Sequence, residues 1–340
     1  MATKKKAYAQ AGVDVDLGNR VKRGIQQLVR KTHGPEVLGE VGGFGGLFAP
    51  DFRGMREPVL VSSVDGVGTK LKVAFAMGKH DTVGADLVNH CINDIAVLGA
   101  RPLFFLDYIG AERLEPSVFT QLLRGFTHAC RAGGCALIGG ETAQMPGMYQ
   151  RGEYDLAGTI VGVVDRKEML DGTRIKRGDV ILGLRSNGLH TNGYSLARSV
   201  LLDQLHLKLS SRLPQLKDSL GAELLRTHVN YQPTLANIPR GVLRGLVHIT
   251  GGGLVDNPPR ILPANCDAVI DTRSWKIPAI FTLIEAGGHV PHEEMFQVFN
   301  MGIGMLAIVP KQHAVATARA LKAVTVGRIE AGTGVTRLLL

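Results

Sequence analysis

Short apolar segments that end in glycine turns alternate with segments of helical periodicity along the first half of the chain, and this alternation constrains the fold more than any other feature. Apolar residues recur at helical spacing over residues 16–31, about 84–98 and 117–132. The strand-like segments beside them are PVLVSSV, LFFLDYI, CALIGG and DLAGTIVGVV. The intervening VGGFGGLFAPDF is rich in glycine and predicts a loop. Strands that alternate with helices predict an α/β domain.

A charged segment with two glycines, near residues 165–178, precedes a second series of elements. These are a strand DVILGLRS, a helix near 194–205, a helix that starts near Pro278, a strand GIGMLAIVP and a helix over 311–323. A chain of 340 residues is long for one domain, since about 150 residues per domain is typical. We therefore predict two α/β lobes, an N-terminal domain over residues 1–170 and a C-terminal domain over residues 171–340.

The net charge of +9, from 39 lysines and arginines against 30 aspartates and glutamates, predicts a surface that attracts anions. Phosphorylated small molecules and nucleic acid both fit this charge. Nucleic acid is disfavoured because the basic residues are scattered and aromatic residues make up only 5% of the chain. The one basic cluster, at residues 4–6, is interpreted as a solvated tail.

Cysteine spacing and hydropathy predict the compartment. The four cysteines show no CxxC spacing, which argues against a structural zinc site or a disulfide framework, and we expect them to be reduced. No uninterrupted apolar run reaches the roughly 18 residues that a membrane-spanning helix needs. We therefore expect a cytoplasmic protein without a membrane partner.

The segment SVDGVGTK resembles a phosphate-binding loop, but Thr69 precedes Lys70, whereas the nucleotide-binding P-loop has its lysine first. Gly66 and Gly68 would let the backbone approach a ligand closely. Asp65, at the end of a predicted strand, could then ligate magnesium, and the lysine could neutralise a phosphate. The alternative is an ordinary glycine turn with a capping aspartate and a solvated lysine, and the segment alone leaves both open.

A polar stripe runs along the otherwise apolar helix predicted over 84–98. Asp86, His90 and Asp94 recur at intervals of four residues, with asparagines beside them. Buried carboxylates are costly unless they are paired or bind a metal, and magnesium prefers hard oxygen ligands. Asp94 could therefore contact magnesium, whereas His90 by itself is interpreted as a hydrogen-bonded structural residue. An exposed polar face of the helix remains the alternative.

Three further loops carry polar residues next to glycines. In LIGGETAQMPGMY, Glu141 lies at the carboxyl end of a strand, where α/β folds place ligand sites. In RSNGLHTNGYSLAR, backbone N–H groups at a helix start could bind an anion, and His190 could transfer a proton or polarise an oxygen. In HITGGGLVDN, three glycines allow close approach of a ligand. Ordinary turn chemistry is the alternative for the last two loops.

Other motifs with known chemistry are missing from the sequence. It contains no GxSxG elbow, no HExxH and no GxGxxG that opens a helix. Hydrolase, zinc-protease and dinucleotide-binding functions therefore lose most of their support.

Six segments, in the same order, resemble the phosphoribosylformylglycinamidine cyclo-ligase family, also called aminoimidazole ribonucleotide synthetases. They are SVDGVGTKL, NDIAVLGARPLFFLDYI, IGGETAQMPGMY, YDLAGTIVGVVDR, SNGLHTNGYSL and HITGGGLVDNPPRILP. The resemblance extends from about Tyr8 to the C-terminal strand region. It implies ATP-dependent cyclisation of formylglycinamidine ribonucleotide to 5-aminoimidazole ribonucleotide in purine biosynthesis. It also implies a homodimer in which two N-terminal α/β domains form a central β-barrel, each followed by a C-terminal α/β domain, with ATP in the cleft.

The same resemblance implies roles for single residues. Magnesium would be held by Asp65, Asp94 and Glu141 around the phosphates of ATP. The nucleotide-binding residues that it implies are Lys31, Asp65, Gly66, Gly68, Thr69, Asp94, Gly140, Glu141, Gly251 and Gly252. Catalytic roles fall on Lys70, His190 and Asn192, and we assign proton transfer or oxygen polarisation to the last two as a hypothesis.

The chain departs from the family's pattern in its second half, where Leu235–Asn237 and Leu254–Asp256 replace the usual residues. Thiamine-phosphate kinase and selenophosphate synthetase, from the same superfamily, are the alternative enzymes. A non-catalytic anion-binding protein is the alternative from another class. The long matches GGETAQMPGMY and LHTNGYSL favour the cyclo-ligase.

Overall fold

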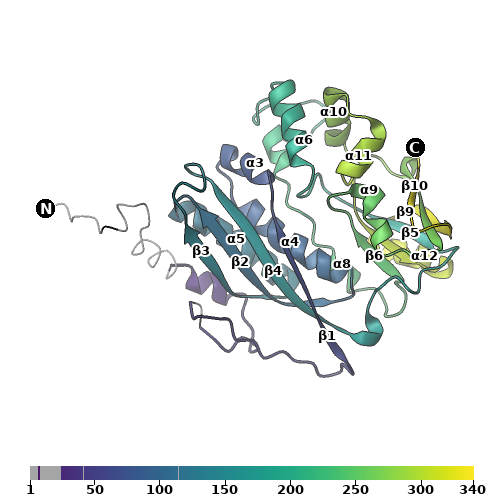
Figure 1. Cartoon of the computed structure of the whole chain (residues 1–340), viewed down its shortest axis with the longest axis horizontal. Coiled ribbons are helices and arrows are strands. Elements are labelled where there is room, and N and C mark those ends of the chain that lie inside the picture. The colour runs from purple at the N-terminus through teal and green to yellow at the C-terminus, as the bar shows by residue number, and fades with distance from the viewer. Residues whose placement is uncertain (1–6, 8–23, 41, 114) are drawn as a thin grey trace.

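The computed structural model describes residue 7 and residues 24–40, 42–113 and 115–340, and these residues form two lobes, each built on one β-sheet (Figure 1). The predicted α/β class and two-lobed organisation are confirmed. A helix over residues 24–30 is the described part of the first expected helix. The remainder of that helix, the basic cluster at 4–6 and the start of the family resemblance at Tyr8 lie outside the described residues.

The N-terminal lobe is a four-stranded sheet with two long helices on one face. Its elements are β1 (Pro58–Gly66), α3 (Lys70–Met77), α4 (Asp81–Ala96), β2 (Arg101–Ala111), α5 (Pro116–Gly133), β3 (Ala136–Gln144) and β4 (Tyr154–Asp165). The strand order is β1-β4-β2-β3, in which β2 and β3 are parallel and the other neighbours antiparallel. In Figure 1, α4 and α5 lie behind this sheet, and no labelled helix covers its front face.

The C-terminal lobe is built on a mixed six-stranded sheet in the order β10-β7-β9-β5-β8-β6. Its strands are β5 (Val180–Arg185), β6 (Gly245–His248), β7 (Cys266–Asp271), β8 (Ile303–Val309), β9 (Val324–Ala331) and β10 (Thr336–Leu339). Its α-helices are α6 (Tyr194–Arg198), α7 (Leu220–Leu224), α8 (Gln232–Leu235), α9 (Gly253–Asp256), α10 (Ala279–Gly288), α11 (His292–Val298) and α12 (Ala314–Leu321). Shorter helical turns are η1 (Arg166–Glu168), η2 (Ser199–Gln204), η3 (Pro258–Arg260), η4 (Thr272–Ser274) and η5 (Lys311–His313).

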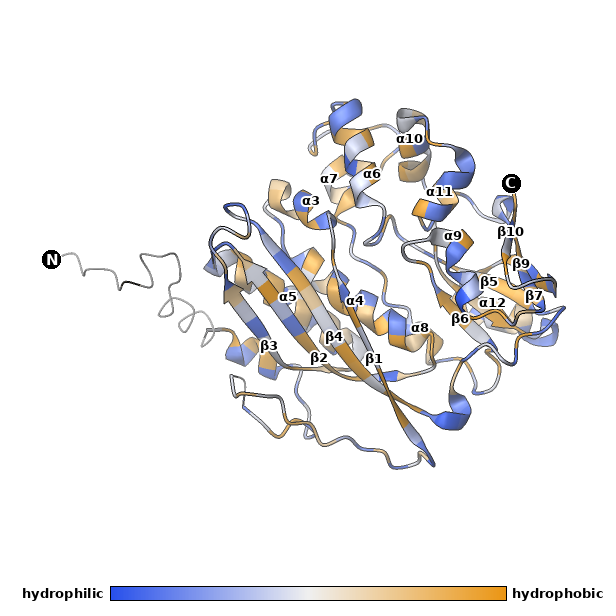
Figure 2. Ribbon diagram, viewed as in Figure 1, coloured by the Kyte–Doolittle hydropathy of each residue, from blue (hydrophilic) through white to orange (hydrophobic). Residues whose placement is uncertain are grey.

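Hydrophobic periodicity explains most of these elements. The apolar residues of α4 face the core, and its C-terminal end is followed by Gly99 in the left-handed conformation, with φ of 83°. β8 is buried at every position because it lies between β5 and β6 within the sheet. Figure 2 shows hydrophobic residues along the strands of both sheets and hydrophilic residues on parts of outer helices such as α11.

Two predicted helices differ in detail from the structure. The helix predicted near 194–205 is a short α6 that continues as a π-helical turn over Ser199–Gln204. The helix predicted over 311–323 begins with the 3₁₀ turn Lys311–His313 after a proline, and its α-helical part starts at Ala314. The connection between β4 and β5, residues 166–179, contains the predicted domain boundary at 170/171. Among the described residues, no helix is both long enough and apolar enough to cross a membrane.

Part of the polar stripe on α4 binds the C-terminal lobe. Asn89 donates through Nδ2 to the carbonyl of His228 at 2.8 Å. Asn93 donates through Nδ2 to the carbonyl of Val229 at 2.8 Å and accepts from the backbone N–H of Tyr231 at 2.9 Å. The asparagines of the stripe are therefore buried between the lobes and are structural.

Candidate active site

A cleft of about 420 Å³ lies between the two lobes. The N-terminal lobe contributes the end of β1 and the polar side of α4, and the C-terminal lobe contributes the end of β6 and the loop that follows it. The polar residues that line the cleft are Ser63, Asp65, His90, Asp94, Asp171, His248, Thr250, Asn257 and Arg260. Such a lining suits a charged substrate better than an apolar one.

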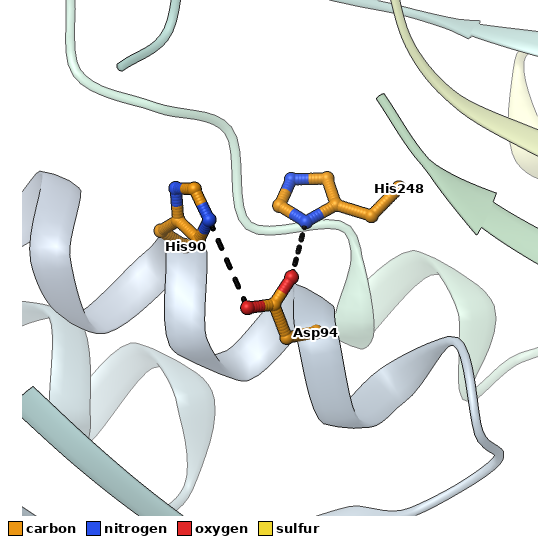
Figure 3. Close-up of side chains that lie close together, drawn as sticks. All are labelled: His90, Asp94 and His248. Carbon is orange, nitrogen blue, oxygen red and sulfur yellow. Dashed lines mark hydrogen bonds and ion pairs between the residues drawn. The ribbon is translucent and has the colours of Figure 1, made fainter. Parts of the chain in front are cut away.

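Two carboxylates and two imidazoles meet at the floor of the cleft, three of them drawn in Figure 3. Nδ1 of His248 lies 2.8 Å from Oδ1 of Asp94. Nε2 of His90 lies 3.7 Å from Oδ2 of Asp94 and 2.7 Å from Oδ2 of Asp65. The side chain of Asp65 is 41% exposed, whereas those of the two histidines are 4% exposed. The carboxylates therefore face the cleft and the imidazoles lie behind them.

A buried shell holds both imidazoles from the side opposite the cleft. Nδ1 of His90 lies 2.8 Å from Oγ1 of Thr191. The same hydroxyl lies 3.3 Å from Nδ1 of His228, and Nε2 of His228 lies 3.0 Å from Nε2 of His248. These hydrogen bonds join α4, the loop before α6, the segment after α7 and β6 in one network.

The charges at the floor follow from these contacts. Burial raises the pKa of Asp65 and of Asp94, but His90 and His248 outweigh burial and lower both pKa values overall. Burial lowers the pKa of His90, but the two carboxylates outweigh it and raise that pKa overall. Burial and the neighbouring imidazoles lower the pKa of His228 well below its usual value. At neutral pH the two carboxylates are therefore ionised and His228 is neutral.

A second cavity of about 320 Å³ lies beside β3, beneath the glycine-rich segment 42–46. Its walls are mainly apolar and come from the helix over 24–30, α5, β2 and β3. Asp107 and Thr142 are polar residues in this lining. Burial raises the pKa of Asp107 from its usual 3.8 to about 7, and the charge of Glu141 acts in the same direction. An apolar cavity with a few polar groups is typical of a small-molecule site.

The structure brings Asp65 and Asp94 together and leaves Glu141 apart, so the three predicted magnesium ligands do not form one site within one chain. A row of paired residues crosses the sheet from Asp65 through Gly158 and Asp107 to Gly140, which is the neighbour of Glu141 in the chain. Three strand spacings separate the ends of this row, about 14 Å, and Glu141 points to the opposite face from its neighbour Gly140. One ion therefore cannot contact all three carboxylates of one chain. Asp65 and Asp94 each have an imidazole nitrogen among their partners, whereas magnesium prefers oxygen ligands.

Lys70 does not lie in the cleft, contrary to its predicted role with a phosphate. Its side chain is completely buried, and Nζ lies 2.7 Å from Oδ2 of Asp86. The same ammonium donates to the carbonyls of His190 at 2.9 Å and Arg226 at 2.7 Å. Because three oxygens surround Nζ, Lys70 joins α3 and α4 to the C-terminal lobe instead of facing a ligand.

His190 also lies behind the cleft, which does not fit its predicted role as a group that exchanges a proton with the substrate. It is 1% exposed and its backbone has a φ of 63°. Its ring stacks on that of His228 at 4.0 Å between centroids, and neither ring nitrogen has a hydrogen-bond partner. Burial lowers its pKa well below the usual value, so the ring is neutral.

The other predicted loop residues lie at the junction of the lobes or on the surface. Asn192 is half-buried, and a Cβ at Gly251 would lie 3.5 Å from its Oδ1, so these two loops are adjacent. Thr69 lies on the exposed loop before α3, where its Oγ1 is 3.1 Å from Oγ of Ser195. Lys31 is exposed just after the helix over 24–30. The nucleotide-binding roles of these residues stay predictions.

Of the remaining predicted glycines, Gly68 and Gly252 have turn conformations, whereas Gly66 and Gly140 lie in β1 and β3. Gly68 and Gly252 have φ values of 70° and 96°, which residues with a Cβ rarely adopt. The amide of Gly66 donates to Oδ1 of Asp65 at 2.6 Å and fixes the carboxylate. A Cβ at Gly140 would collide with the carboxyl and the backbone oxygen of Asp107.

Three site residues were not predicted from the sequence. His248 is the first residue of HITGGG and lies three positions before its glycines at a strand end, a signal similar to the one that pointed to Glu141. Asp107 is a lone acid inside the apolar strand LFFLDYI, which is also a usable signal. His228 has no such signal, because its place depends on how its segment packs against α4.

Family comparisons cover most of the chain. Residues 53–164 match the AIR synthase related protein, N-terminal domain, and residues 176–339 match the AIR synthase related protein, C-terminal domain. The phosphoribosylformylglycinamidine cyclo-ligase of Anaeromyxobacter sp. (strain K) is 52% identical over 330 residues, 96% of each chain. That of Syntrophotalea carbinolica is 52% identical over 312 residues, 92% of this chain and 89% of the relative.

Solved structures share the fold at low identity. Thiamine-monophosphate kinase from Stenotrophomonas maltophilia K279a superimposes with a TM-score of 0.67 at 21% identity, over 92% of this chain and 95% of its own. Hydrogenase maturation protein HypE, in complex with ATP, superimposes with a TM-score of 0.69 at 16% identity, over 97% and 93%. Several activities thus occur on this two-lobed fold.

Proposed function

The chain belongs to the phosphoribosylformylglycinamidine cyclo-ligase family of AIR synthase related proteins, and from that membership we propose that it cyclises formylglycinamidine ribonucleotide to 5-aminoimidazole ribonucleotide at the expense of ATP. The observation that carries the proposal is 52% identity along 96% of the chain to an enzyme of that name. Membership makes the protein a ligase of purine biosynthesis.

The reaction needs a good leaving group at the formyl carbon. ATP transfers its terminal phosphoryl group to the formyl amide oxygen and leaves as ADP. The amidine nitrogen then attacks the same carbon, loses a proton, and inorganic phosphate departs with the former formyl oxygen. Because both substrates are anions and the charge that moves is on a phosphoryl group, the protein acts mainly by positioning and electrostatic stabilisation.

We assign the two substrates to the two cavities. The apolar cavity beneath segment 42–46 suits the purine base of ATP, and the glycines there let the chain approach the nucleotide. The polar cleft between the lobes suits the phosphorylated substrate, with Arg260 as a cation and Asn192 next to the glycine loop at Gly251. ATP in the HypE structure supports nucleotide binding on this fold. Asp65 and Asp107 lie two strand spacings apart, about 10 Å, in one row of the sheet.

In this proposal, magnesium binds to the protein together with the nucleotide. Because Asp65, Asp94 and Glu141 do not converge, we attribute no step to a magnesium ion held by these three side chains. ATP is expected to bind as its magnesium complex, in which the phosphates supply the oxygen ligands. We also propose that the enzyme acts in the cytoplasm.

The open face of the N-terminal sheet supports the homodimer. Leu60 and Val64 on β1 are 63% and 68% exposed. Val161 on β4, and Phe104 and Leu106 on β2, lie on the same face, because paired residues share a face. The ring of Phe48 packs against Phe104, with 5.2 Å between the ring centroids, and covers part of this face. An apolar sheet face that no helix of its own chain covers is typical of an interface. We therefore propose that two such sheets pack together as the central barrel of a dimer.

A direct assay tests the function. The protein is incubated with magnesium-ATP and formylglycinamidine ribonucleotide, and the aminoimidazole product is measured. Thiamine monophosphate in place of the ribonucleotide tests the alternative enzyme suggested by the shared fold. We expect product only from the ribonucleotide. ATP turnover that depends on thiamine monophosphate, without aminoimidazole from the ribonucleotide, would refute the proposal.

Asp94→Asn gives a matched test of the cleft. It removes the charge beside His248 while keeping the side-chain shape, and we expect turnover to fall by orders of magnitude. Asp203→Asn, on the short helical turn after α6, changes the charge by the same amount away from the cleft lining and should retain wild-type turnover. Wild-type turnover of the Asp94 variant would show that the carboxylate has only a structural role.

A further inference from the structure

We propose that the floor of the cleft is a binding site for a first-row divalent transition ion, such as Zn²⁺ or Mn²⁺, held by Nε2 of His90, Nδ1 of His248 and the carboxylate of Asp94. The predicted magnesium ligands were all carboxylates, whereas the structure places two imidazoles beside Asp94 and one beside Asp65. Imidazole ligands suit zinc, iron and similar ions, whereas magnesium keeps oxygen ligands.

The donor atoms have the spacing that an ion needs. Ligand atoms of His90, Asp94 and His248 all lie within 4.8 Å of one another. Individual separations are 2.8 Å from His248 to Asp94 and 3.7 Å from His90 to Asp94. Bonds of about 2.1 Å to one ion place neighbouring ligand atoms roughly 3.0 to 3.5 Å apart, so small side-chain movements would complete the site. Asp65, 2.7 Å from His90, is a further carboxylate within reach.

His90 points a nitrogen at this cluster without a hydrogen bond to hold it. Its side chain is 4% exposed, and Nε2 is buried without a hydrogen-bond partner. Nε2 lies 2.7 Å from Oδ2 of Asp65 and 3.7 Å from Oδ2 of Asp94, so it is directed at both carboxylates. A buried imidazole nitrogen that faces two carboxylates in this way has the surroundings of a ligand whose cation would satisfy all three groups.

The shell behind the imidazoles supports ligation. If His90 donates from Nδ1 to the hydroxyl of Thr191, its Nε2 presents a lone pair to the cleft. If His248 donates from Nε2 to His228, its Nδ1 likewise presents a lone pair to Asp94. His228 can then donate from Nδ1 to the same threonine oxygen, which has two acceptor positions. Every nitrogen of the shell is satisfied in this arrangement.

The site also has an open side. The ligand residues line a cleft of about 420 Å³, so an ion at the floor would keep coordination positions directed at the cavity. An oxygen of a molecule in the cleft could occupy such a position. Binding of the ion itself requires neither nucleotide nor ribonucleotide, so it can be tested independently of the proposed ring closure.

Calorimetric titration of the untagged, chelator-treated full chain with Zn²⁺, in the absence of nucleotide, tests the site. We expect one Zn²⁺ per chain that Mg²⁺ at the same concentration does not displace. His90→Asn and His248→Asn should each weaken binding by at least about tenfold, and Thr191→Val, which removes only the supporting hydroxyl, by about 10- to 100-fold. His313→Asn, at an exposed position on η5, is the matched control and should bind like the wild type.

A measurement on the wild type alone tests the metal site even if the variants fail to fold. Electron spin-echo spectroscopy of the Mn²⁺-loaded protein should show coupling to imidazole nitrogen. Absence of nitrogen coupling, absence of a bound ion, or equal binding by the wild type and folded His90→Asn and His248→Asn variants would each overturn the proposal. The cluster would then be a hydrogen-bonded network that holds protons instead of a metal.

Discussion

Lys70 and Asp86 carry opposite charges that are both completely buried, with 2.7 Å between Nζ and Oδ2. From the sequence, Lys70 was expected to neutralise a phosphate, because it follows a glycine loop. A lysine after a glycine loop has the same sequence pattern whether it faces solvent or the interior. Its actual partners lie up to 156 residues away along the chain, so only the packed lobes reveal its role.

Lys70→Met should destabilise the protein strongly. It leaves the buried carboxylate of Asp86 without its cation, which typically costs about 3–5 kcal/mol of unfolding free energy. Lys72→Met on the same helix removes a partly exposed ion pair with Glu153 and should cost less than about 1 kcal/mol. Urea unfolding measures both. Equal, small losses in the two variants would contradict the structural role of Lys70.

The titration of Asp107 should appear in the pH dependence of stability. Burial raises its pKa from 3.8 to about 7, so the folded state favours the protonated carboxyl. The stability that this group contributes is complete below the unfolded pKa and is lost as pH rises through the folded pKa. As pH rises from about 4 to about 7, the unfolding free energy of Asp107→Asn should therefore increase relative to that of the wild type. Below and above this range the difference between the two proteins should stay constant.

Unfolding in urea at a series of pH values, with wild type and variant side by side, measures this difference. Glu115→Asn, at an exposed position before α5, is the control and should not reproduce the trend. A stability difference for Asp107→Asn that stays constant across the whole range would contradict the raised pKa.

At the scale of elements, apolar periodicity predicted the helices and strands, because burial of one face of each element leaves a local pattern in the sequence. The strands PVLVSSV and LFFLDYI and the helix that became α4 follow from that pattern. Strand order does not, because it depends on contacts between distant segments. The order β1-β4-β2-β3 puts Asp65 and Glu141 on opposite edge strands, so within one chain these two carboxylates cannot share one ion. The approach of α4 to β6 creates the histidine cluster in the same non-local way.

The close contact of β2 and β3 predicts a large difference between two glycine substitutions. Gly140→Ala would drive a methyl group into the carboxyl and backbone oxygen of Asp107, and overpacking of this kind costs about 1–3 kcal/mol. Gly45→Ala, in the loop above the same cavity, meets open space and should change stability by less than about 0.5 kcal/mol. Thermal unfolding measures the stability change of each variant relative to the wild type. Equal stabilities of the two variants would contradict the observed packing.

At the scale of the whole molecule, two lobes close around a polar cleft, and no labelled helix covers the front face of the N-terminal sheet. The lobes are joined by the asparagines of α4 and by Lys70, so the cleft has a fixed floor. The sequence predicted two lobes from length and from the charged connection near 165–178. The reaction was predicted from six long motifs, because long motifs identify a family and its chemistry more specifically than any single residue does.

The sheet face that no labelled helix covers predicts the oligomeric state. Wild-type protein should sediment as a dimer, and Leu60→Asp with Val64→Asp should shift it to monomer, because charged side chains would be buried at the interface. Val315→Asp, on α12 of the other lobe and 79% exposed, introduces the same group outside this face and should remain dimeric. A monomeric wild type at micromolar concentration would contradict the proposed barrel.

The fate of the formyl oxygen tests the central claim most directly. Formylglycinamidine ribonucleotide labelled with oxygen-18 at the formyl group is converted with magnesium-ATP, and the released phosphate is examined by mass spectrometry. Phosphorylation of that oxygen before ring closure predicts that each phosphate carries the label and appears in equal amount with aminoimidazole. Unlabelled phosphate, or ATP hydrolysis without aminoimidazole, would contradict the proposed cyclisation.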